Sequence, residues 1–534
     1  MSSIIRQKVG DKIYLYESVS YRNAEGKPRN KRVPIGKIDP STGQPIYKPD
    51  YLARMLASGA YIETAASTQT FTQTFTPDDI RRSSVLEFGA MYLLQSIAQQ
   101  IGLLNALQST LPKVHQEIFT LACYLVTSGD PFLYCEEWLS KTLCPAVGSL
   151  SSQRISDLLQ AITPDQRETF YQAWCQLRCE QEYLALDITS TSSYSDLIQD
   201  VEWGYNRDKE QLPQINICML MGETSRLPIY QVLYSGSLKD VSTLETTLSK
   251  MDVISGGKPT LAVMDKGFFS TRNVNAMLNR STPTRFVIAI PFTSKFAKKM
   301  VASERKDIDC LQHTLVIGED SLRAVTKERA WNEKHRLYTH VYYHAMKALK
   351  LREELYAHVT VLKEKAQTDP KAALKDESSR KYLIIRKSEN TSSGYTVNIR
   401  EEVVAKELET AGWLVVLSND VSDAKEALSI YRRKDVVEKG FLRLKTQLDL
   451  GRLRVHRDDS MQNKVFIGFI ALILMSHLHK VMLEKDLYKN MTMKKLLLIL
   501  SKLRVQHING QRILFPLTKE QKAIYKAFAV KEPV

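Results

Sequence analysis

Two short apolar stretches, each followed by an aspartate, constrain the fold of this chain most strongly. EYLALD ends at Asp187 and KPTLAVMD ends at Asp265. Both stretches have the length and composition of buried β-strands. Between residues 182 and 291 further strand patterns alternate with helical ones, and this order predicts a mixed sheet with both faces covered.

The same pattern resumes after a long interruption. AGWLVVLSND predicts one more strand, and DAKEALSIYRRKDVVEKGFLRLK predicts one long helix. With them, residues 181–291 and 411–485 match the element order of a ribonuclease-H-like α/β core. Residues 292–410 contain charged strands and a Lys-rich helix, and a loop of that length would be implausible in a compact domain. We therefore predict a β-rich subdomain inserted into the core.

The regions before and after this core differ from it in composition. Residues 12–20 and 30–37 alternate apolar and polar positions around the turn-rich NAEGKP, which predicts a basic β-hairpin module over 1–60. The hairpin residues that we expect to contact a polyanion are Arg22, Arg29, Lys31 and Arg32. Composition then divides the rest into a Thr/Ser-rich linker over 61–83, a helical domain for DNA binding or dimerisation over 84–180, and a basic helical region over 486–534.

One helix pair in the helical domain has two interpretations. SSQRISDLLQAI is followed closely by TPDQRETFYQAW, where Thr163 can cap a helix and Pro164 can occupy its first turn. The pair is either a helix-turn-helix DNA reader or, the better-supported reading, a plain helix pair.

Positive charge is concentrated at the two ends of the chain. Lys and Arg number 74 against 59 Asp and Glu, a net charge of +15. Residues 1–60 carry a net +6 and residues 443–534 a net +11, so the part between them is close to neutral. Basic ends attract polyanions and are typical of a protein that grips a duplex outside its catalytic core, although a solvated surface has the same signature.

Nothing in the sequence indicates export or a membrane partner. The N-terminus has no long apolar segment, and the apolar run over 465–475 is too short to span a bilayer and predicts a buried helix. The 7 cysteines form no CxxC pair, which favours reduced thiols. We therefore expect a cytoplasmic protein.

A third acid, Glu438, lies on the long helix predicted after the last core strand. At about 100° per residue a polar wedge about 60° wide adjoins the apolar stripe that docks the helix on the sheet. The residues in this wedge are Tyr431, Lys434, Glu438 and Lys445. The wedge points along the sheet edge where Asp187 and Asp265 are expected, which is where open sheets bind ligands. The alternatives are aspartates that only cap turns and a solvated helix face.

Three carboxylates at one site predict metal-dependent chemistry. Without cations they would repel one another, whereas two divalent ions turn their charge into binding energy. All-oxygen ligands suit Mg²⁺ or Mn²⁺. Two such ions can activate a water or a 3′-hydroxyl for in-line attack at a phosphodiester. Lys434 and Lys445, one and two turns from Glu438, are placed to hold the phosphates.

At these residues the sequence resembles the DDE transposases of bacterial insertion sequences, in the branch with a Tyr-Arg-Glu-Lys signature and an insertion before the catalytic Glu. The matching segments, between about 183 and 480, are LDITSTSSYS, GYNRDKEQLPQ, SGSLKDVSTL, MDKGFFSTRN and YRRKDVVEKGFLRLK. The resemblance implies that Asp187, Asp265 and Glu438 bind two Mg²⁺ ions per active site, for which Mn²⁺ can substitute. It also implies cut-and-paste cleavage and joining of the element's ends, by a homodimer on double-stranded DNA and often through a hairpin intermediate.

Two positions depart from the family pattern. The Arg of the signature falls on Lys434, which keeps the charge but loses the bidentate fork, and Arg433 is placed to compensate. Lys266 stands where Arg is common. Relatives that form hairpins stack a flipped base on an aromatic ring, and Trp331 is the one Trp in residues 292–410. It is either such a stacking residue or a structural Trp.

Other functions fit the sequence less well. SGGKPT over 255–260 resembles a phosphate loop, but Asp252 stands where that motif requires Gly, so we expect no ATP. A domesticated relative that binds DNA without cutting, and a stand-alone nuclease of the same fold, remain alternatives. The expected partner is double-stranded DNA in a bacterial nucleoid.

Overall fold

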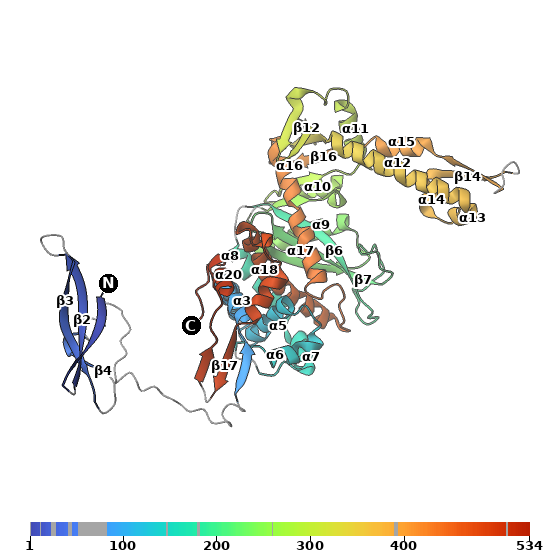
Figure 1. The fold of residues 1–534 in the computed structure, drawn as a ribbon. Helices are drawn as coiled ribbons and strands as arrows, with labels where there is room; N and C mark the ends of the chain where they lie inside the picture. The colour runs from blue at the N-terminus through green and yellow to red at the C-terminus, as the bar shows by residue number, and fades with distance from the viewer. Residues whose placement is uncertain are drawn as a thin grey trace. The chain divides into compact units, whose positions relative to one another are not determined.

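The computed structural model describes residues 2–10, 12–22, 28–40, 45–51, 83–145, 148–178, 182–258, 260–388, 394–508 and 511–534. These residues form two compact units, one N-terminal and small, the other containing most of the chain (Figure 1). The predicted Thr/Ser-rich linker over 61–83 lies outside the described residues except for its last position.

The N-terminal unit is an antiparallel sheet of order β1-β2-β3-β4. Its strands are β1 (Ser2–Val9), β2 (Lys12–Arg22), β3 (Pro28–Ile38) and β4 (Pro45–Tyr47). The pairing of β2 with β3 is the hairpin that the alternating pattern predicts. Leu15, Ile35 and Tyr51 form its small core.

The larger unit begins with a strand and six helices. They are β5 (Ser84–Glu87), α3 (Gly89–Gln100), α4 (Leu103–Thr110), α5 (His115–Thr127), α6 (Cys135–Leu139), α7 (Ser152–Ala161) and α8 (Pro164–Leu177). Thr163 caps α8 and Pro164 occupies its first turn, as the sequence predicts. Phe170 and Trp174 are fully buried on α8, so this face of the helix packs inside the protein.

A nine-stranded mixed sheet of order β11-β12-β13-β16-β10-β9-β6-β7-β8 forms the centre of this unit. Its strands are β6 (Leu184–Ser192), β7 (Gln214–Gly222), β8 (Pro228–Ser235), β9 (Leu261–Met264), β10 (Arg285–Ala289), β11 (Thr314–Ile317), β12 (Asp320–Ala330), β13 (Arg336–Tyr343) and β16 (Trp413–Ser418). The β6–β9 and β9–β10 pairs are parallel, and the other pairs are antiparallel. The mixed α/β sheet predicted from the sequence is therefore present.

Helices on the sheet supply the rest of the core. They are α9 (Asp240–Ser255), α10 (Thr271–Leu278), α11 (Lys295–Glu304), α16 (Ala424–Arg433), α17 (Asp435–Thr446) and α18 (Asp458–Glu484). In length and composition α18 could cross a membrane, but 78% of its most apolar window is buried inside the protein. It is the buried helix predicted over 465–475, extended by polar residues at both ends.

Residues 292–410 differ from the predicted β-rich subdomain. Strands β11, β12 and β13 extend the central sheet, because β13 pairs with β16 along six residues. The remainder is largely helical and projects as an arm (Figure 1). The arm contains α12 (Ala345–Thr368), α13 (Pro370–Ala373), α14 (Glu377–Tyr382), the β14 (Leu383–Lys387) and β15 (Tyr395–Ile399) ribbon, and α15 (Glu401–Leu408). Its own small apolar cluster includes Val359, Leu383 and Val404.

The predicted single long helix is in fact two helices. α16 ends at Arg433 and α17 begins at Asp435, with Lys434 between them. The Lys434 amide donates to the Tyr431 carbonyl at 3.4 Å, a tighter turn than an α-helix makes. The apolar stripe continues across the junction, which is why periodicity alone reads one helix.

The chain ends in the basic region. Its elements are α19 (Met493–Ser501), β17 (Arg504–Ile508), β18 (Gln511–Leu514) and α20 (Lys519–Ala527). Thr518 caps α20 in a capping box, as predicted. The Asn-Gly turn predicted between the two strands lies outside the described residues.

Candidate active site

The register of two parallel strands brings the two aspartates together. In the β6–β9 pair Leu186 is opposite Met264, and Asp187 and Asp265 are the residues that follow these two along the sequence. β9 ends there, as predicted. β6 does not: Asp187 lies in the middle of a nine-residue strand that continues to Ser192 beside β7. The prediction that Asp187 ends its strand was therefore wrong.

Asp187 lies in a poorly solvated place. Burial raises its pKa to about 6, while the positive charges of Arg207 and Lys434 lower it and the negative charge of Asp240 raises it. A carboxylate is expensive to bury unless a cation or donors compensate it. The position is therefore one where an added positive charge would stabilise the ionised form.

Asp265 and Tyr431 connect the sheet edge to α16. The Tyr431 hydroxyl donates a hydrogen bond of 2.8 Å to Oδ1 of Asp265. Burial and the neighbouring Asp265 charge raise the pKa of Tyr431 above its ordinary value, and Glu438 and Asp187 act in the same direction. Tyr431 thus remains a neutral donor that fixes one oxygen of Asp265.

Lys434 stands among the three acids. Its Nζ is 2.6 Å from Oε1 of Glu438, and its side chain is only 12% exposed. Burial alone would lower the pKa of Lys434, but the Glu438 hydrogen bond and the Asp265 and Asp187 charges raise it. One ammonium group therefore balances carboxylates from β6, the end of β9 and α17. Each of the three predicted acids thus acts on Lys434, and two members of the predicted polar wedge contact an acid directly: Tyr431 contacts Asp265 and Lys434 contacts Glu438.

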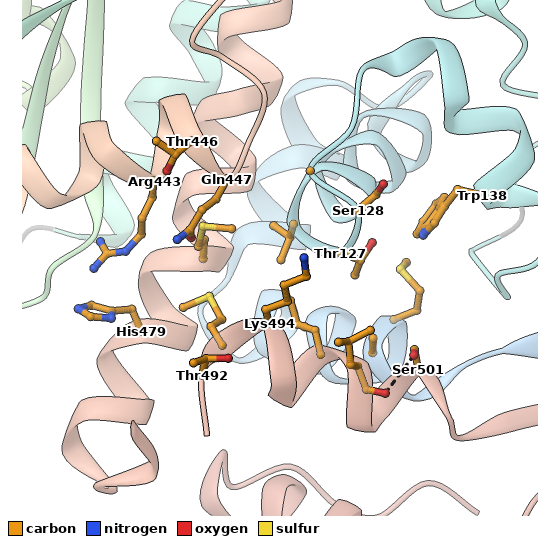
Figure 2. Close-up of a pocket in the computed structure, with 18 of the residues that line it drawn as sticks. Thr127, Ser128, Trp138, Arg443, Thr446, Gln447, His479, Thr492, Lys494 and Ser501 are labelled. Atoms are coloured by element: carbon orange, nitrogen blue, oxygen red, sulfur yellow. Dashed lines mark hydrogen bonds between the residues drawn. The ribbon is translucent and has the colours of Figure 1, made fainter. Parts of the chain in front are cut away.

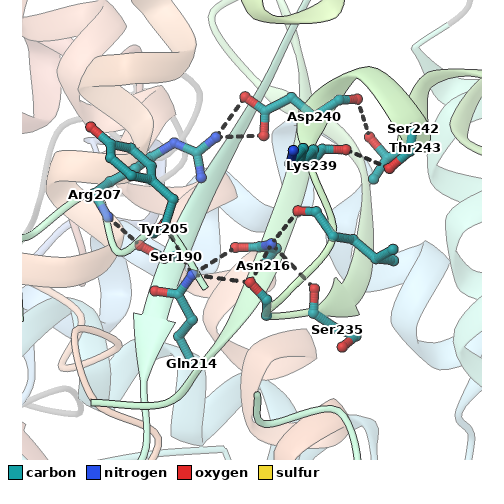
Figure 3. A network of polar contacts seen from close by, with 12 residues as sticks. Ser190, Tyr205, Arg207, Gln214, Asn216, Ser235, Lys239, Asp240, Ser242 and Thr243 are labelled. Carbon is teal, nitrogen blue, oxygen red and sulfur yellow. Dashed lines mark hydrogen bonds and ion pairs between the residues drawn. The ribbon is translucent and has the colours of Figure 1, made fainter. Parts of the chain in front are cut away.

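A polar network behind Asp187 positions the adjoining loops (Figure 3). The Arg207 guanidinium binds both carboxylate oxygens of Asp240, at 2.6 and 2.7 Å, and its amide donates to the Ser190 hydroxyl. Asn216 donates to the carbonyls of residues 235, 236 and 238. Sequence reasoning quoted these segments but gave Arg207, Asp240 and Asn216 no role. The signal was an Asn inside the otherwise apolar strand LPQINICMLM.

Comparisons with known proteins agree with this architecture. A family model described as "Transposase DDE domain" matches residues 179–474, more than half of the chain. This chain belongs to the DDE transposase family. The match includes the sheet from β6 to β16, the arm and most of α18.

A search of curated proteins found no match. Among solved structures, the chain is similar to a piggyBac transposase in a synaptic complex with hairpin DNA, determined by cryo-electron microscopy. That match has 13% sequence identity, covers 76% of this chain and 70% of the other, and has a TM-score of 0.33.

Two of the predicted phosphate-binding residues of this DDE domain, Lys445 and Arg433, form ion pairs with acids. Lys445 contacts Asp208 at 2.6 Å, and Arg433 pairs with the buried Glu223. Lys266 is exposed beside Asp265. Each pairing partner comes from a segment far away in sequence, so helical periodicity could not find it. In this structure these cations are ordered by protein carboxylates.

The remaining predicted contacts are Trp331 and the four hairpin residues. Trp331 is partly buried: its indole Nε1 donates to Asn275 at 2.8 Å and its ring packs edge-on against Phe296. In the N-terminal unit Lys31 and Arg32 are exposed on β3. The side chains of Arg22 and Arg29 lie outside the described part of the structure.

DDE transposases generally use divalent metal ions. Among the described residues no three His, Cys, Asp or Glu side chains lie close enough together to hold a metal ion. The donor chemistry of Asp187, Asp265 and Glu438 is of the kind that such an ion prefers, because all three are oxygen donors and all three act on one cation, the Lys434 ammonium.

Proposed function

We propose that this chain is a DNA transposase that binds the inverted-repeat ends of a bacterial insertion sequence, cleaves them and joins their 3′ ends to target DNA. The observation that carries the proposal is the convergence of Asp187, Asp265 and Glu438 on Lys434 within a DDE domain. Two of these acids, Asp187 and Asp265, follow paired residues of the parallel strands β6 and β9.

The three carboxylates would hold two Mg²⁺ or Mn²⁺ ions, which when bound activate a water or a 3′-hydroxyl and stabilise the leaving oxygen. The chain's own residues do the positioning. Tyr431 holds one oxygen of Asp265. Lys434 compensates the acids until other cations do so. It is then one turn from Glu438, where it can donate hydrogen bonds to a DNA phosphate.

Two cations that form ion pairs with protein acids can exchange these partners for DNA phosphates. Lys445 and Arg433 are held by Asp208 and Glu223, and a DNA phosphate offers each the same acceptor chemistry. Pre-ordered cations lose less side-chain entropy when DNA arrives. The exposed Lys266 and the basic ends add contacts, with the protein acting in the bacterial cytoplasm as a homodimer on paired ends.

The proposal also includes a hairpin intermediate in which Trp331 stacks on a flipped base. Trp331 is anchored through its nitrogen, which leaves its ring to stack on a base. In Trp331→Ala we expect normal nicking and impaired hairpin closure. Normal closure would exclude this role.

The proposed function is tested with a duplex that carries the element's ends, a target plasmid and Mg²⁺. Joined products support a transposase. End binding without a nick favours the DNA-binding alternative, and nicking without joining favours a nuclease. Asp265→Asn controls for contaminating nucleases, because it removes one proposed metal ligand and leaves the fold's apolar core unchanged.

A further inference from the structure

A large cavity lies beside α17, on a part of the helix surface that does not include Glu438. Its volume is about 970 Å³, and α3, α5, α17, α18 and α19 enclose it. Most of the lining is apolar, including Met91, Leu442 and Met475. Figure 2 shows Arg443 and His479 at one end of the cavity and Trp138 at the other. The cavity belongs to none of the machinery described above.

Arg443 is the unusual residue of this cavity. It is only 9% exposed, yet its guanidinium has no hydrogen bond or ion pair with any residue in the described ranges. Burial lowers the pKa of Arg443; the neighbouring Tyr488 raises it, and the positive charge of Arg226 lowers it. Buried guanidinium groups are normally paired, because an uncompensated charge is costly in a poorly solvated place. The protein thus retains a costly charge that faces open space.

Two further cations, Arg226 and Lys439, act on the same end of the cavity, whereas His479 is neutral there. Burial lowers the pKa of His479 to about 4, and Arg443, Arg226 and Lys439 lower it too. His479 shares a 2.7 Å hydrogen bond with the Tyr488 hydroxyl, so both are held in place. The Arg226 guanidinium has no acceptor in the described part of the chain either.

Acids do little to offset these charges. Lys439 is partnered by Asp435 at 2.6 Å. Glu87 is the one carboxylate among the residues that line the cavity, and it lies on β5. Neither acid contacts Arg443 or Arg226. The end of the cavity near Arg443 is therefore an electropositive recess without its own counter-ion.

We infer that this recess, lined by Arg443, His479 and Tyr488 and with the charge of Arg226 acting on it, is a binding site for a phosphate group. Two guanidinium groups match a phosphate, which accepts bidentate hydrogen bonds and carries up to two negative charges, better than they match a carboxylate. The phosphate belongs either to a DNA backbone or to a free phosphorylated compound. The apolar remainder of the cavity has room for the group attached to it.

The test uses the full chain and inorganic phosphate as the probe, at constant ionic strength with chloride as the competing anion. Calorimetric titration and thermal unfolding should show phosphate binding to the unmodified protein. Arg443→Met keeps the apolar stem and should weaken this binding by about tenfold or more. The control Arg272→Met removes an equally charged side chain that is 85% exposed, and should bind phosphate normally.

A second variant protects the test against misfolding. Arg226 has a left-handed backbone with φ of 61°, and Asn tolerates that conformation, so Arg226→Asn should fold and also bind phosphate more weakly. The site is excluded if the unmodified protein binds phosphate no more tightly than Arg443→Met and Arg226→Asn do.

The source of the phosphate is read from DNA binding. If a backbone phosphate occupies the recess, Arg443→Met should reduce the slope of log K against log[salt] for a duplex by about 0.9, the value of one contact. If phosphate binding is lost and the slope is unchanged, the ligand is a free phosphorylated compound. Both results support the site, and neither requires the protein to cut DNA.

Discussion

Two regions on different sides of α17 both contain poorly solvated charges, but only one of them has a charge of opposite sign to balance it. Glu438 lies on one side and Arg443 about 140° around the helix from it, by the usual helical geometry. Glu438 and the two aspartates are balanced by the Lys434 ammonium. Arg443 has no balancing acid in the described residues. A balanced site is ordered before its ligand arrives, whereas an unbalanced one carries a cost that only a ligand removes.

The largest expected effect removes a carboxylate from the balanced side. Asp265→Asn keeps the size of the side chain and can still accept from Tyr431, but it loses a charge that suits a divalent ion. We expect cleavage of end-containing DNA to fall by about 10³-fold or more, with little change in DNA affinity. Gel-based cleavage and mobility-shift assays measure the two quantities. Cleavage within tenfold of the unmodified protein would remove Asp265 from the active site.

Protonation of the buried His340 would place an unbalanced charge inside the protein, and the pH dependence of stability shows what that charge costs. His340 is fully buried: its Nε2 donates to the Val421 carbonyl at 3.0 Å, and the Thr326 hydroxyl donates to Nδ1 at 2.7 Å. Burial lowers the pKa of His340 from 6.5 to about 4. The unfolded chain therefore binds this proton at a higher pH than the folded protein, so stability is present above pH 6.5 and is lost as pH falls toward 4.

The loss should be about 3 kcal/mol over that range, at 1.36 kcal/mol per pKa unit. His340→Gln should remove this share of the pH dependence, as measured by chemical denaturation from pH 7 down to about 4.5. His456→Gln, at an exposed position, is the control. An identical pH profile for His340→Gln and the unmodified protein would mean that His340 is charged in the folded state.

Removing the balancing cation should destabilise the active site. Lys434→Gln leaves three carboxylates without their ammonium, and we expect the free energy of unfolding in EDTA to fall by about 2 kcal/mol. Adding Mg²⁺ should recover much of this loss. Lys439→Gln, on the same helix and with the same spacing to its acid, is exposed and should change stability by less than about 0.5 kcal/mol. Equal losses in the two variants would show that Lys434 balances nothing.

The sequence allowed the acids to be found but not their surroundings. Apolar runs before Asp187 and Asp265 and the polar wedge around Glu438 are local patterns, and a sheet edge is where such patterns converge. The continuation of β6 past Asp187 was missed because Ser190 and Ser192 look like loop residues. Inside the fold they accept hydrogen bonds from Arg207 and Asn206, which makes them acceptable in a buried strand.

Arg443 shows the same limit more clearly. Around the predicted helix it falls opposite the apolar stripe, where a charged residue is expected to face solvent. The chain near His479 and Tyr488 covers it, and only tertiary structure reveals that. The sheet strands within 292–410 were likewise assigned to an insertion, because pairing between β13 and β16 joins residues far apart in sequence.

The smallest predicted effect is a gain in stability at Arg443, whereas the Lys434 change causes a loss. The two signs together test whether one side of α17 is balanced and the other is not. In phosphate-free buffer, Arg443→Met should raise the free energy of unfolding by about 1 kcal/mol, because it replaces an unpaired buried charge with an apolar side chain of similar length. Chemical denaturation measures this, and Arg272→Met should show no gain. Phosphate should then reverse the order of stability, since only the unmodified protein gains from binding it. A destabilised Arg443→Met would mean that the guanidinium has a protein partner, and that both sides of α17 are balanced after all.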